Sequence, residues 1–479
     1  MHATSGTARR RRRLLLINPT NPRISLLGLH ESRWNVYRIW QPLGLMTLAA
    51  LTPAEWEPSI VDENLGGPDY QAMPRPDLVG ITAFTSQANR AYQLAARFRA
   101  RGVPVVMGGI HATTCHEEAL GHVDAVVTGE ADEVWPQVLD DARAGRLTGR
   151  YAGGQADLVE LPPARHDLLP ARYLFGSLQT TRGCPLDCSF CSVKTISGAG
   201  YRQRPVQDVV REMRLIREPG VLLVDDNLIG TRPEHLARAK ELFRAIAEEG
   251  PRKEWIAQAT INFSDDEELM SLAARAGCRG VYIGFESPTR EGLGEVRKPF
   301  NLAGDRDLRA AVRRIQRHKI LVVGSFVIGL DIDRPGIGML IADAASHYGV
   351  NMLNVAFLTP LPGTRLWDQM QAEDRIVLND FPRDWSRYTM GFPVARYKRL
   401  SMGASIAEVE SSNECFYSWR RTVRRVGRDL LERRQPVRSL VSNLTYRSNA
   451  RLSLRTHAQF VRSEARRIAE TRGSGGSGL

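Results

Sequence analysis

Three cysteines within one short segment carry the clearest chemistry in this chain. Cys184, Cys188 and Cys191 lie in the run Arg182-Gly-Cys-Pro-Leu-Asp-Cys-Ser-Phe-Cys-Ser192, so their spacing is Cys-x3-Cys-x2-Cys. Three thiolates can bind one centre, and they are one short of the four ligands that close a zinc or an iron–sulfur site. The spacing therefore predicts a four-iron cluster with one iron open to another ligand. Chance clustering and a zinc site are the alternatives, and zinc would need a fourth ligand where the only nearby histidine is His166.

The composition is typical of a globular protein with several domains. The 479 residues exceed one ordinary domain, and 43% hydrophobic with 25% charged residues allows large buried cores. The other cysteines, at 115, 278 and 415, are scattered, which favours a reducing compartment over a disulfide framework. No run approaches the ~18 apolar residues of a membrane span, and the apolar run before Asn18 is too short for an export signal. We therefore expect a cytoplasmic protein.

Positive charge is concentrated at the two ends of the chain. The net charge is +12, residues 9–13 are five consecutive arginines, and residues 396–479 contain 18 Arg and Lys against 7 Asp and Glu. Such ends suit an anionic membrane surface, an acidic substrate or a partner, and solvated helix faces are an equally good interpretation. Peripheral association with the inner face of the membrane is thus one alternative. No segment resembles a module for specific nucleic-acid binding.

The first part of the chain has the pattern of a parallel α/β sheet. Short β-branched or Leu-rich runs alternate with helical stretches from residue 14 to about 145. The expected strands are 14–18, 57–62, 78–82, 104–107 and 125–128, and the expected helices include 42–51 and 88–101. Small or polar residues follow these strands. Because ligands bind at the carboxyl ends of strands in such sheets, we expect a binding site along that edge.

A second α/β series follows a segment rich in Gly and Pro. Its expected strands are 176–181, 221–226, 255–258, 280–286, 321–328 and 351–357, and helices separate them. Six strand–helix units with nearly continuous apolar strands predict a partial (β/α)6, TIM-like barrel, with its chemistry at the C-terminal strand ends. The first of these strands leads directly into the cysteine run. After residue 395 we expect two Arg-rich amphipathic helices, at 412–432 and 450–469.

The cysteine spacing resembles that of the radical S-adenosylmethionine (radical SAM) enzymes. In that family the open iron is chelated by the amino and carboxylate groups of S-adenosylmethionine, and reductive cleavage of this cofactor gives a 5′-deoxyadenosyl radical. The first sheet resembles the cobalamin-binding domain that precedes the barrel in a large subfamily. The segments that carry this second resemblance, in order, are Asn18-Pro19, Pro42–Leu45, Val61–Asn64, Met107–Thr113 and Val127–Glu130.

The resemblance implies an α/β protein of five segments. These are a Rossmann-like cobalamin-binding domain at 12–150, a linker at 151–175, a radical SAM barrel at 176–395, a basic α-helical C-terminal domain at 396–472 and a flexible tail at 473–479. It also implies three cofactors: a [4Fe-4S] cluster, S-adenosylmethionine and cobalamin. An external electron donor of the flavodoxin or ferredoxin type would be a partner.

The resemblance further implies roles for particular residues. Cys184, Cys188 and Cys191 would bind the cluster. Contacts to S-adenosylmethionine would come from Phe190, Asp225, Asp226, Asn227, Glu286 and Ser325, where Asp225 to Asn227 replace the Gly-Gly-Glu-like turn usual in the family. Contacts to cobalamin would come from Asn18, Pro19, Thr82, Thr85, Gly108, Gly109, His111, Thr113, Gly129 and Glu130. No single catalytic residue is assigned.

One departure from many cobalamin proteins concerns the cobalt ligand. The chain lacks the Asp-x-His-x-x-Gly motif whose histidine binds cobalt from below. We therefore expect His111 to contact a loop, and residues 82–86 to lie near the lower face of the corrin.

The function implied is a cobalamin-dependent radical SAM enzyme that methylates an unactivated carbon through methylcobalamin and a 5′-deoxyadenosyl radical. One alternative uses the same cofactors for oxidative cyclisation, rearrangement or hydroxylation without methyl transfer. A second alternative is a non-catalytic sensor that binds a cluster or cobalamin. The substrate would be a small molecule or a lipid, and the sequence does not identify it.

Overall fold

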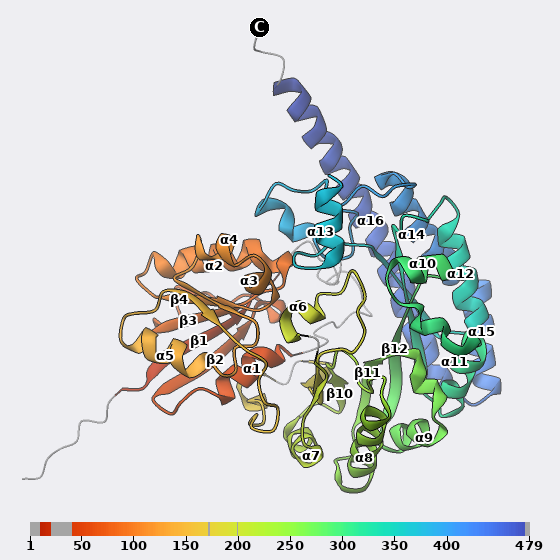
Figure 1. Cartoon of the computed structure of the whole chain (residues 1–479), viewed down its shortest axis with the longest axis horizontal. Coiled ribbons are helices and arrows are strands. Elements are labelled where there is room, and N and C mark those ends of the chain that lie inside the picture. The colour runs from red at the N-terminus through yellow and green to blue at the C-terminus, as the bar shows by residue number, and fades with distance from the viewer. Residues whose placement is uncertain (1–9, 21–40, 171–172, 199, 475–479) are drawn as a thin grey trace, which may run out of the picture. The chain divides into compact units, whose positions relative to one another are not determined.

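The chain forms two compact α/β units. The computed structural model describes residues 10–20, 41–170, 173–198 and 200–474 (Figure 1). Of these described residues, the first unit comprises 10–20, 41–170 and 195–197, and the second comprises 173–194, 198 and 200–474. Each unit is built around its own parallel sheet of six strands.

The first unit has the order of a doubly wound sheet. Its strands are β1 (Arg12–Asn18), β2 (Trp56–Asp62), β3 (Leu78–Thr82), β4 (Val105–Gly108), β5 (Ala125–Thr128) and β6 (Gly149–Ala152), arranged β2-β1-β3-β4-β5-β6. Its helices are α1 (Leu43–Ala50), α2 (Ala88–Arg99), α3 (Ile110–Thr114), α4 (His116–Leu120) and α5 (Trp135–Arg143). Figure 1 shows α2, α3 and α4 on one face of the sheet and α1 and α5 on the other.

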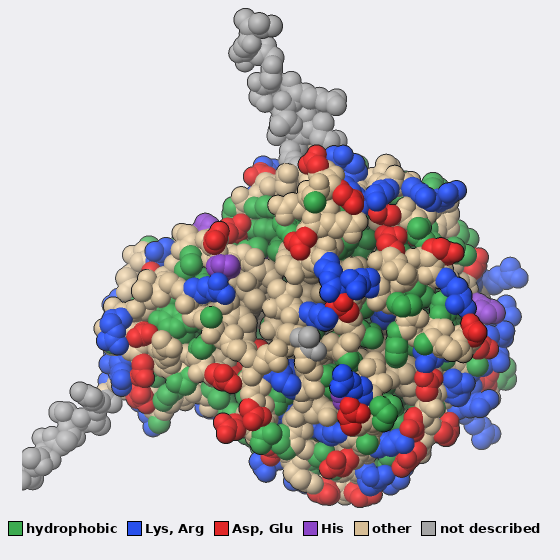
Figure 2. Space-filling model, in the orientation of Figure 1, with side chains coloured by type: hydrophobic (Ala, Val, Ile, Leu, Met, Phe, Trp, Pro, Cys, Tyr) green, Lys and Arg blue, Asp and Glu red, His purple; other side chains and the backbone are tan. Residues whose placement is uncertain are grey.

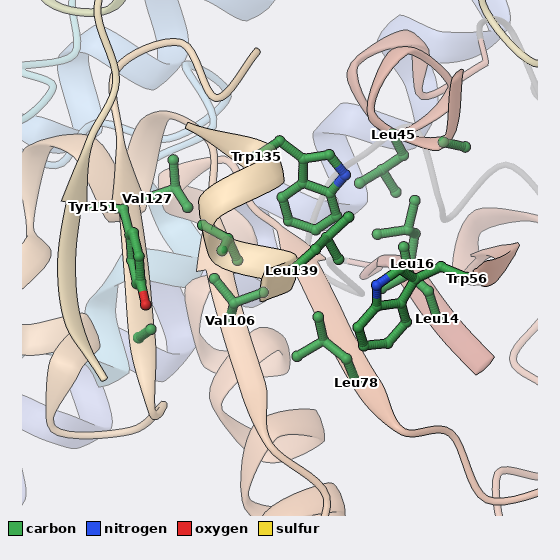
Figure 3. Packing of buried hydrophobic residues seen from close by; sticks show 13 residues of the cluster. Leu14, Leu16, Leu45, Trp56, Leu78, Val106, Val127, Trp135, Leu139 and Tyr151 are labelled. Carbon is green, nitrogen blue, oxygen red and sulfur yellow. The ribbon is translucent and has the colours of Figure 1, made fainter. Parts of the chain in front are cut away.

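A buried cluster holds α1 and α5 on the sheet (Figure 3). Leu14, Leu16 and Leu78 project from the strands toward Trp135, which is 2% exposed. The Trp135 Nε1–H donates to Thr52 Oγ1 at 3.0 Å, so this large ring is buried with its only polar atom satisfied. Four consecutive residues of β1, from Leu14 to Ile17, are buried, which explains why its Leu-rich run predicted a core strand.

The sixth strand of this sheet was not predicted. Strand β6 pairs with β5 from Gly149 to Ala152 and lies where the sequence suggested the start of a linker. It is four residues long and carries only one buried side chain, Tyr151. Such a short strand gives too few residues for an alternating pattern to be recognised.

The second unit has six parallel strands that pair in chain order. They are β7 (Phe175–Leu178), β10 (Gly220–Leu223), β11 (Glu254–Ala259), β12 (Cys278–Glu286), β13 (Leu321–Ile328) and β14 (Met352–Phe357). The helices are α7 (Val206–Leu215), α8 (Pro233–Glu249), α9 (Glu267–Arg275), α10 (Arg290–Glu295), α11 (Leu308–Arg317), α12 (Ile337–Tyr348) and α13 (Arg365–Ala372). A short hairpin of β8 (Thr181–Arg182) and β9 (Arg202–Gln203) brackets the cysteine segment.

Three helices follow the barrel: α14 (Met402–Phe416), α15 (Trp419–Leu431) and α16 (Pro436–Ser474). The prediction of one helix at 412–432 was wrong, because the chain turns at Tyr417 and Ser418. The buried Tyr417 hydroxyl donates to the Leu353 carbonyl at 2.7 Å and accepts from the Leu353 N–H at 2.8 Å, which fixes the turn on β14. The helix expected at 450–469 is the middle of α16. Of the predicted tail, residues 473–474 end α16, and residues 475–479 lie outside the described residues.

The predicted fold class is confirmed by the two parallel sheets and the helices that follow them. Within the residues that the structure describes, no helix combines the length and apolar content required to span a bilayer.

Candidate active site

The three cysteines lie in the loop between β8 and the short helix α6 (Val193–Ser197). Asp187, in the middle of this loop, accepts from Lys194 Nζ at 2.5 Å and from Arg365 Nη1 at 2.6 Å. These two cations lower the pKa of Asp187 to about 2. The Ser189 N–H also donates to the Val296 carbonyl at 3.2 Å. The loop is therefore held by contacts with α6, with α13 and with the segment after α10.

The thiols of Cys184, Cys188 and Cys191 are half-buried and unbridged. Burial raises the pKa of Cys188 to about 12 and of Cys191 to about 11, and it raises the pKa of Cys184 as well. Such thiols ionise readily only when a cation binds them. Within the described residues, no three His, Cys, Asp or Glu side chains converge on a space for a single metal ion. Three thiols in one loop could each bind a separate iron of a four-iron cluster.

The second strand of the barrel ends beside the cysteine loop. Asp225 is fully buried, and it accepts from the Thr180 N–H at 2.6 Å, the Thr180 hydroxyl at 2.6 Å and the Thr181 N–H at 2.9 Å. Both of its oxygens therefore hold the segment that leads into the loop. Asn227 Nδ2 lies 3.8 Å from Cys184 Sγ.

Asp226 differs from its neighbour because its side chain is exposed. One of its oxygens accepts from the Gly183 N–H at 3.2 Å. The structure therefore brings Asp226 and Asn227 to the loop with polar atoms directed at its backbone and at a thiol.

A buried ion pair lies at the end of β12. Glu286 Oε1 accepts from Lys298 Nζ at 2.7 Å, and the same ammonium donates to the Gly284 carbonyl at 2.9 Å. Glu286 has a φ of +62° at a point where the strand register shifts, so its side chain leaves the regular alternation of the strand. Lys298 also lies close enough to Cys188 and Cys184 that its charge opposes the rise in their pKa.

A polar cluster crosses three neighbouring strands inside the barrel. Ser325 Oγ on β13 accepts from the Tyr282 hydroxyl on β12 at 3.2 Å and from Asn354 Nδ2 on β14 at 3.2 Å. Burial raises the pKa of Tyr282 to about 12, so this phenol stays protonated. Of these residues only Ser325 was predicted. Tyr282 and Asn354 occur within strand runs, where a polar residue in an apolar strand was the one available clue.

In the first unit, the loops after β3 and β4 meet closely at Gly109. Gly109 has a φ of +90°, and a Cβ there would lie 2.8 Å from Thr82 Oγ1 and 3.0 Å from the Ala83 backbone. Thr113 Oγ1 donates to the Gly109 carbonyl at 2.9 Å and accepts from the Gly129 N–H at 3.0 Å, which links the loops after β4 and β5. One edge of the sheet in the first unit is thus formed by Thr82, Gly108, Gly109, Thr113 and Gly129.

His111 is fully buried next to this edge. Its Nε2 lies 2.7 Å from the Tyr92 hydroxyl, which donates to Glu118 Oε1 at 2.7 Å. The imidazole therefore packs against α2 and α4. Glu130, 7% exposed, accepts from the Ala156 N–H at 3.0 Å.

The remaining predicted residues of this unit lie at the ends of β1 and β3. Asn18 Nδ2 donates to Asp62 Oδ1 at 3.0 Å, and the buried Gln87 donates from Nε2 to the Pro19 carbonyl at 2.5 Å. Thr85 is buried in the 3-10 turn η3 (Thr85–Gln87). Phe84, directly before it, is 63% exposed. Sequence reasoning missed this ring, although it lies inside the segment expected at the lower corrin face.

Comparisons with known proteins address both units. Residues 34–139 match the B12 binding domain family, and residues 178–334 match the Radical SAM superfamily. The chain is 31% identical over 360 residues to bacteriochlorophyllide d C-12(1)-methyltransferase of Chlorobaculum tepidum, an alignment that covers 72% of this chain and 76% of that protein. The chain belongs to the cobalamin-dependent radical SAM enzymes.

Two further relatives extend this result. Hopanoid C-2 methylase of Rhodopseudomonas palustris is 27% identical over 71% of this chain and 66% of its own length. The structure of the cobalamin-dependent radical SAM enzyme OxsB, with aqua-cobalamin and S-adenosylmethionine bound, superposes with a TM-score of 0.65 at 13% identity, covering 96% of this chain and 81% of that chain. The predictions of a cobalamin-dependent radical SAM methyltransferase and of its three cofactors are thus confirmed.

Proposed function

We propose that this radical SAM enzyme binds its cluster through Cys184, Cys188 and Cys191, with S-adenosylmethionine against Phe190, Asp226, Asn227, Glu286 and Ser325. The observation that carries this assignment is the position of Asn227, whose Nδ2 is 3.8 Å from Cys184 Sγ at the carboxyl end of the barrel strands. When bound, the cluster and its cofactor supply hydrogen abstraction, and cobalamin supplies the methyl group.

The side chains around the loop would position the reactants. The exposed Asp226 carboxylate suits the ammonium of the methionyl group, because a charge-assisted hydrogen bond is stronger than a neutral one. Glu286 has a second oxygen beyond the one paired with Lys298, and this oxygen suits a hydroxyl donor. Asp225 would act indirectly, since its oxygens hold Thr180 and Thr181.

We assign cobalamin to the first unit, at Asn18, Pro19, Thr82, Thr85, Gly108, Gly109, His111, Thr113, Gly129 and Glu130. The close approach of Gly109 to Thr82 supports this assignment, because it leaves backbone rather than side chains along the edge. The exposed Phe84 ring would cover part of the corrin from the same loop.

We propose a large apolar ring system as the substrate class, methylated at an unactivated carbon. The two relatives named above act on a bacteriochlorophyllide and on a hopanoid, and both are of this kind. An external flavodoxin or ferredoxin would supply the electron. We further propose peripheral association with an anionic membrane, where such substrates partition.

The test uses the anaerobically reconstituted full chain with S-adenosylmethionine, cobalamin and a chemical reductant. We expect 5′-deoxyadenosine and a visible-spectrum change that reports methylation of bound cobalamin. C188A should lose both iron and deoxyadenosine, whereas C415A, which removes a half-buried cysteine outside the loop, should retain both. Cleavage by C188A at the wild-type rate would refute the cluster assignment.

The same reaction separates methyl transfer from the alternatives. With bacteriochlorophyllide d as the probe and a deuterated methyl donor, transfer adds a labelled methyl mass. A loss of hydrogen or a gain of oxygen would instead indicate cyclisation or hydroxylation. Binding of both cofactors without any cleavage would indicate a sensor.

A further inference from the structure

Hydrophobic side chains are exposed along the hairpin of α15 and α16. Seven of the fifteen exposed large hydrophobic residues in the described part of the chain lie within residues 419–441. They are Trp419, Val423, Leu430, Leu431, Val437, Leu440 and Val441, with exposures from 40% to 85%. We call these seven residues the α15–α16 patch. Such a concentration of exposed apolar surface marks an interaction site.

Helix α15 buries polar side chains and exposes apolar ones, which is the reverse of an ordinary surface helix. Its buried side chains are polar: Thr422, Arg425 and Asp429. Arg425 donates to Asn443 Oδ1 at 2.7 Å, and Asp429 accepts from the Ser439 hydroxyl at 2.6 Å, so the two helices are joined through hydrogen bonds. The apolar residues are therefore available to a partner because the polar face already holds the hairpin to the protein.

Arginines flank the patch and are available for anions. Arg420, Arg424 and Arg433 are exposed, and none forms an ion pair with a described carboxylate. At the N-terminal end of α15, the guanidinium carbon of Arg447 lies 4.6 Å from the centroid of the Trp419 ring. Figure 2 shows Lys and Arg side chains beside hydrophobic ones on the right-hand side, where α11 and α15 lie.

A cationic cavity of about 580 Å³ adjoins the patch. Arg275 at the end of α9, Arg279 on β12, Lys319 after α11 and Arg438 on α16 line it, together with Val437 of the patch. Glu254 is paired with Arg279 at 3.1 Å and with Arg438 at 2.5 Å.

The remaining cations of the cavity have no such partner. Arg275 and Lys319 are exposed and form no ion pair within the described residues. His318, also in the lining, lies 2.8 Å from Glu267 Oε1. The lining therefore keeps positive charge that can bind an anion such as a phosphate.

The cavity lies at the barrel edge opposite the cysteine loop. Strand β12 begins at Cys278, next to the cavity residue Arg279, and ends at Glu286. At about 3.3 Å per residue, these nine residues place the two edges roughly 26 Å apart. Changes at the cavity can thus be made without touching the proposed cofactor residues.

We propose that the α15–α16 patch and the adjoining cavity dock the enzyme on an anionic lipid bilayer. Trp419, Leu430, Leu431 and Val437 enter the boundary between headgroups and acyl chains, and a lipid phosphate binds in the cavity between Arg275 and Lys319. The surface combines the two contributions that interfacial helices require, an apolar face and flanking positive charge. This inference rests on the proposed membrane association but not on the cofactor assignments.

The test measures flotation of the full-length holoenzyme with vesicles of phosphatidylcholine containing about 30% phosphatidylglycerol, against phosphatidylcholine alone. We expect L430S/L431S/V437S and R275E/K319E each to reduce partitioning to the anionic vesicles at least tenfold. The control R309E/R334E changes the net charge equally at two exposed arginines that lack ion pairs and line no part of the cavity. It should remain within twofold of wild type.

Several outcomes would overturn the docking surface. One is an equal loss of vesicle partitioning in R275E/K319E and in R309E/R334E, since net charge would then explain binding. Another is displacement by millimolar inorganic phosphate with no effect of the apolar triple variant, which would indicate a site for a soluble anion. Binding of duplex DNA without vesicle binding would indicate a nucleic-acid surface. Deoxyadenosine formation is measured in every variant, so a failed cofactor assignment is recognised separately from failed flotation.

Discussion

Lys298 is the residue that connects the end of β12 to the cysteine loop. Its ammonium is bound by Glu286 and by the Gly284 carbonyl, and it is 7% exposed. Burial alone would lower the pKa of Lys298, but attraction to Glu286 and to the nearby thiols outweighs burial and raises it. The side chain therefore stays charged and places a fixed cation beside the proposed thiolate ligands.

Removing this cation should destabilise the folded protein. In K298M the Glu286 carboxylate remains buried without its partner, and breaking a buried pair in this way costs about 3–5 kcal/mol of unfolding free energy. We expect a clear loss in thermal stability, measured by calorimetry under anaerobic conditions. The reduction potential of the reconstituted cluster, measured by potentiometric electron paramagnetic resonance, should also fall, because a nearby positive charge favours the reduced form.

The controls separate the pair from a general effect of losing a lysine. E286Q/K298M should recover most of the stability that K298M loses, because no charge is then left unpaired. K240M removes a more exposed lysine, paired with Asp266 and Glu268, and should cost less than about 1 kcal/mol. Equal losses in K298M and K240M would contradict the role assigned to Lys298.

Asp225 yields a prediction about pH. Burial raises its pKa from 3.8 to about 6 despite three hydrogen bonds, so the folded protein favours the protonated carboxyl. The contribution of Asp225 to stability therefore falls as pH rises from about 4 to about 6, where the folded residue must ionise, and it is lost completely above that range. The loss amounts to at most about 3 kcal/mol.

The variant D225N tests this sign. Its amide oxygen can accept from both backbone N–H groups, and the Thr180 hydroxyl can reverse to accept from the new amide. We expect the difference in melting temperature between D225N and wild type to grow in favour of D225N from pH 4 to pH 6. A difference that is flat across this range would show that Asp225 does not titrate there.

At the scale of elements, the loops after β3 and β4 depend on one close approach. In G109A the new Cβ would lie 2.8 Å from Thr82 Oγ1 and 3.0 Å from backbone atoms of Ala83, at a φ of +90°. We expect a loss of about 1–3 kcal/mol in stability and weaker cobalamin binding, followed by the absorbance of the bound corrin.

The matched control is G66A. Gly66 also has a positive φ, +113°, but no atom lies within 4 Å of a Cβ placed there. It therefore reports backbone strain without the collision. If G66A weakened cobalamin binding as much as G109A, the contact between Gly109 and Thr82 would have no special part in the site.

The elements were predictable to different degrees. The five predicted strands of the first sheet and the six of the barrel are present, because most of them are apolar runs ended by small or polar residues. The turn that separates α14 from α15 was missed, since it depends on the Tyr417 hydroxyl reaching β14 rather than on a Gly or Pro. Periodicity detects what a segment buries, but not a single distant hydrogen bond that ends it.

At the scale of the whole molecule, the sequence could not predict which residues from distant segments come together. Lys298 follows Glu286 by twelve residues, and nothing in the spacing indicates that its amine returns to the strand end. The cavity beside the α15–α16 patch joins Arg275 and Lys319 to Arg438, three residues from widely separated segments. The cysteine loop was predictable because its three cysteines lie close together in the sequence. The other groupings were not predictable because they arise only from packing.

The division into two units leads to a prediction for the intact protein. Cobalamin should protect amides of the first unit, and S-adenosylmethionine on the reconstituted enzyme should protect amides of the second. A ligand that binds only the folded state stabilises it by about 2.7 kcal/mol at a hundred times its Kd, so local opening should slow measurably.

Hydrogen-exchange mass spectrometry on the full chain tests this with three separate additions. Cobalamin should slow exchange at residues 82–88, 108–114 and 128–131, and S-adenosylmethionine should slow exchange at residues 182–192 and 283–287. Vesicles containing phosphatidylglycerol should protect residues 419–445 and leave residues 182–192 and 283–287 unchanged, because docking lies at the opposite edge of the barrel. Protection of the cysteine loop by vesicles alone would contradict that placement, and protection by cobalamin confined to residues 176–395 would contradict its assignment to the first unit.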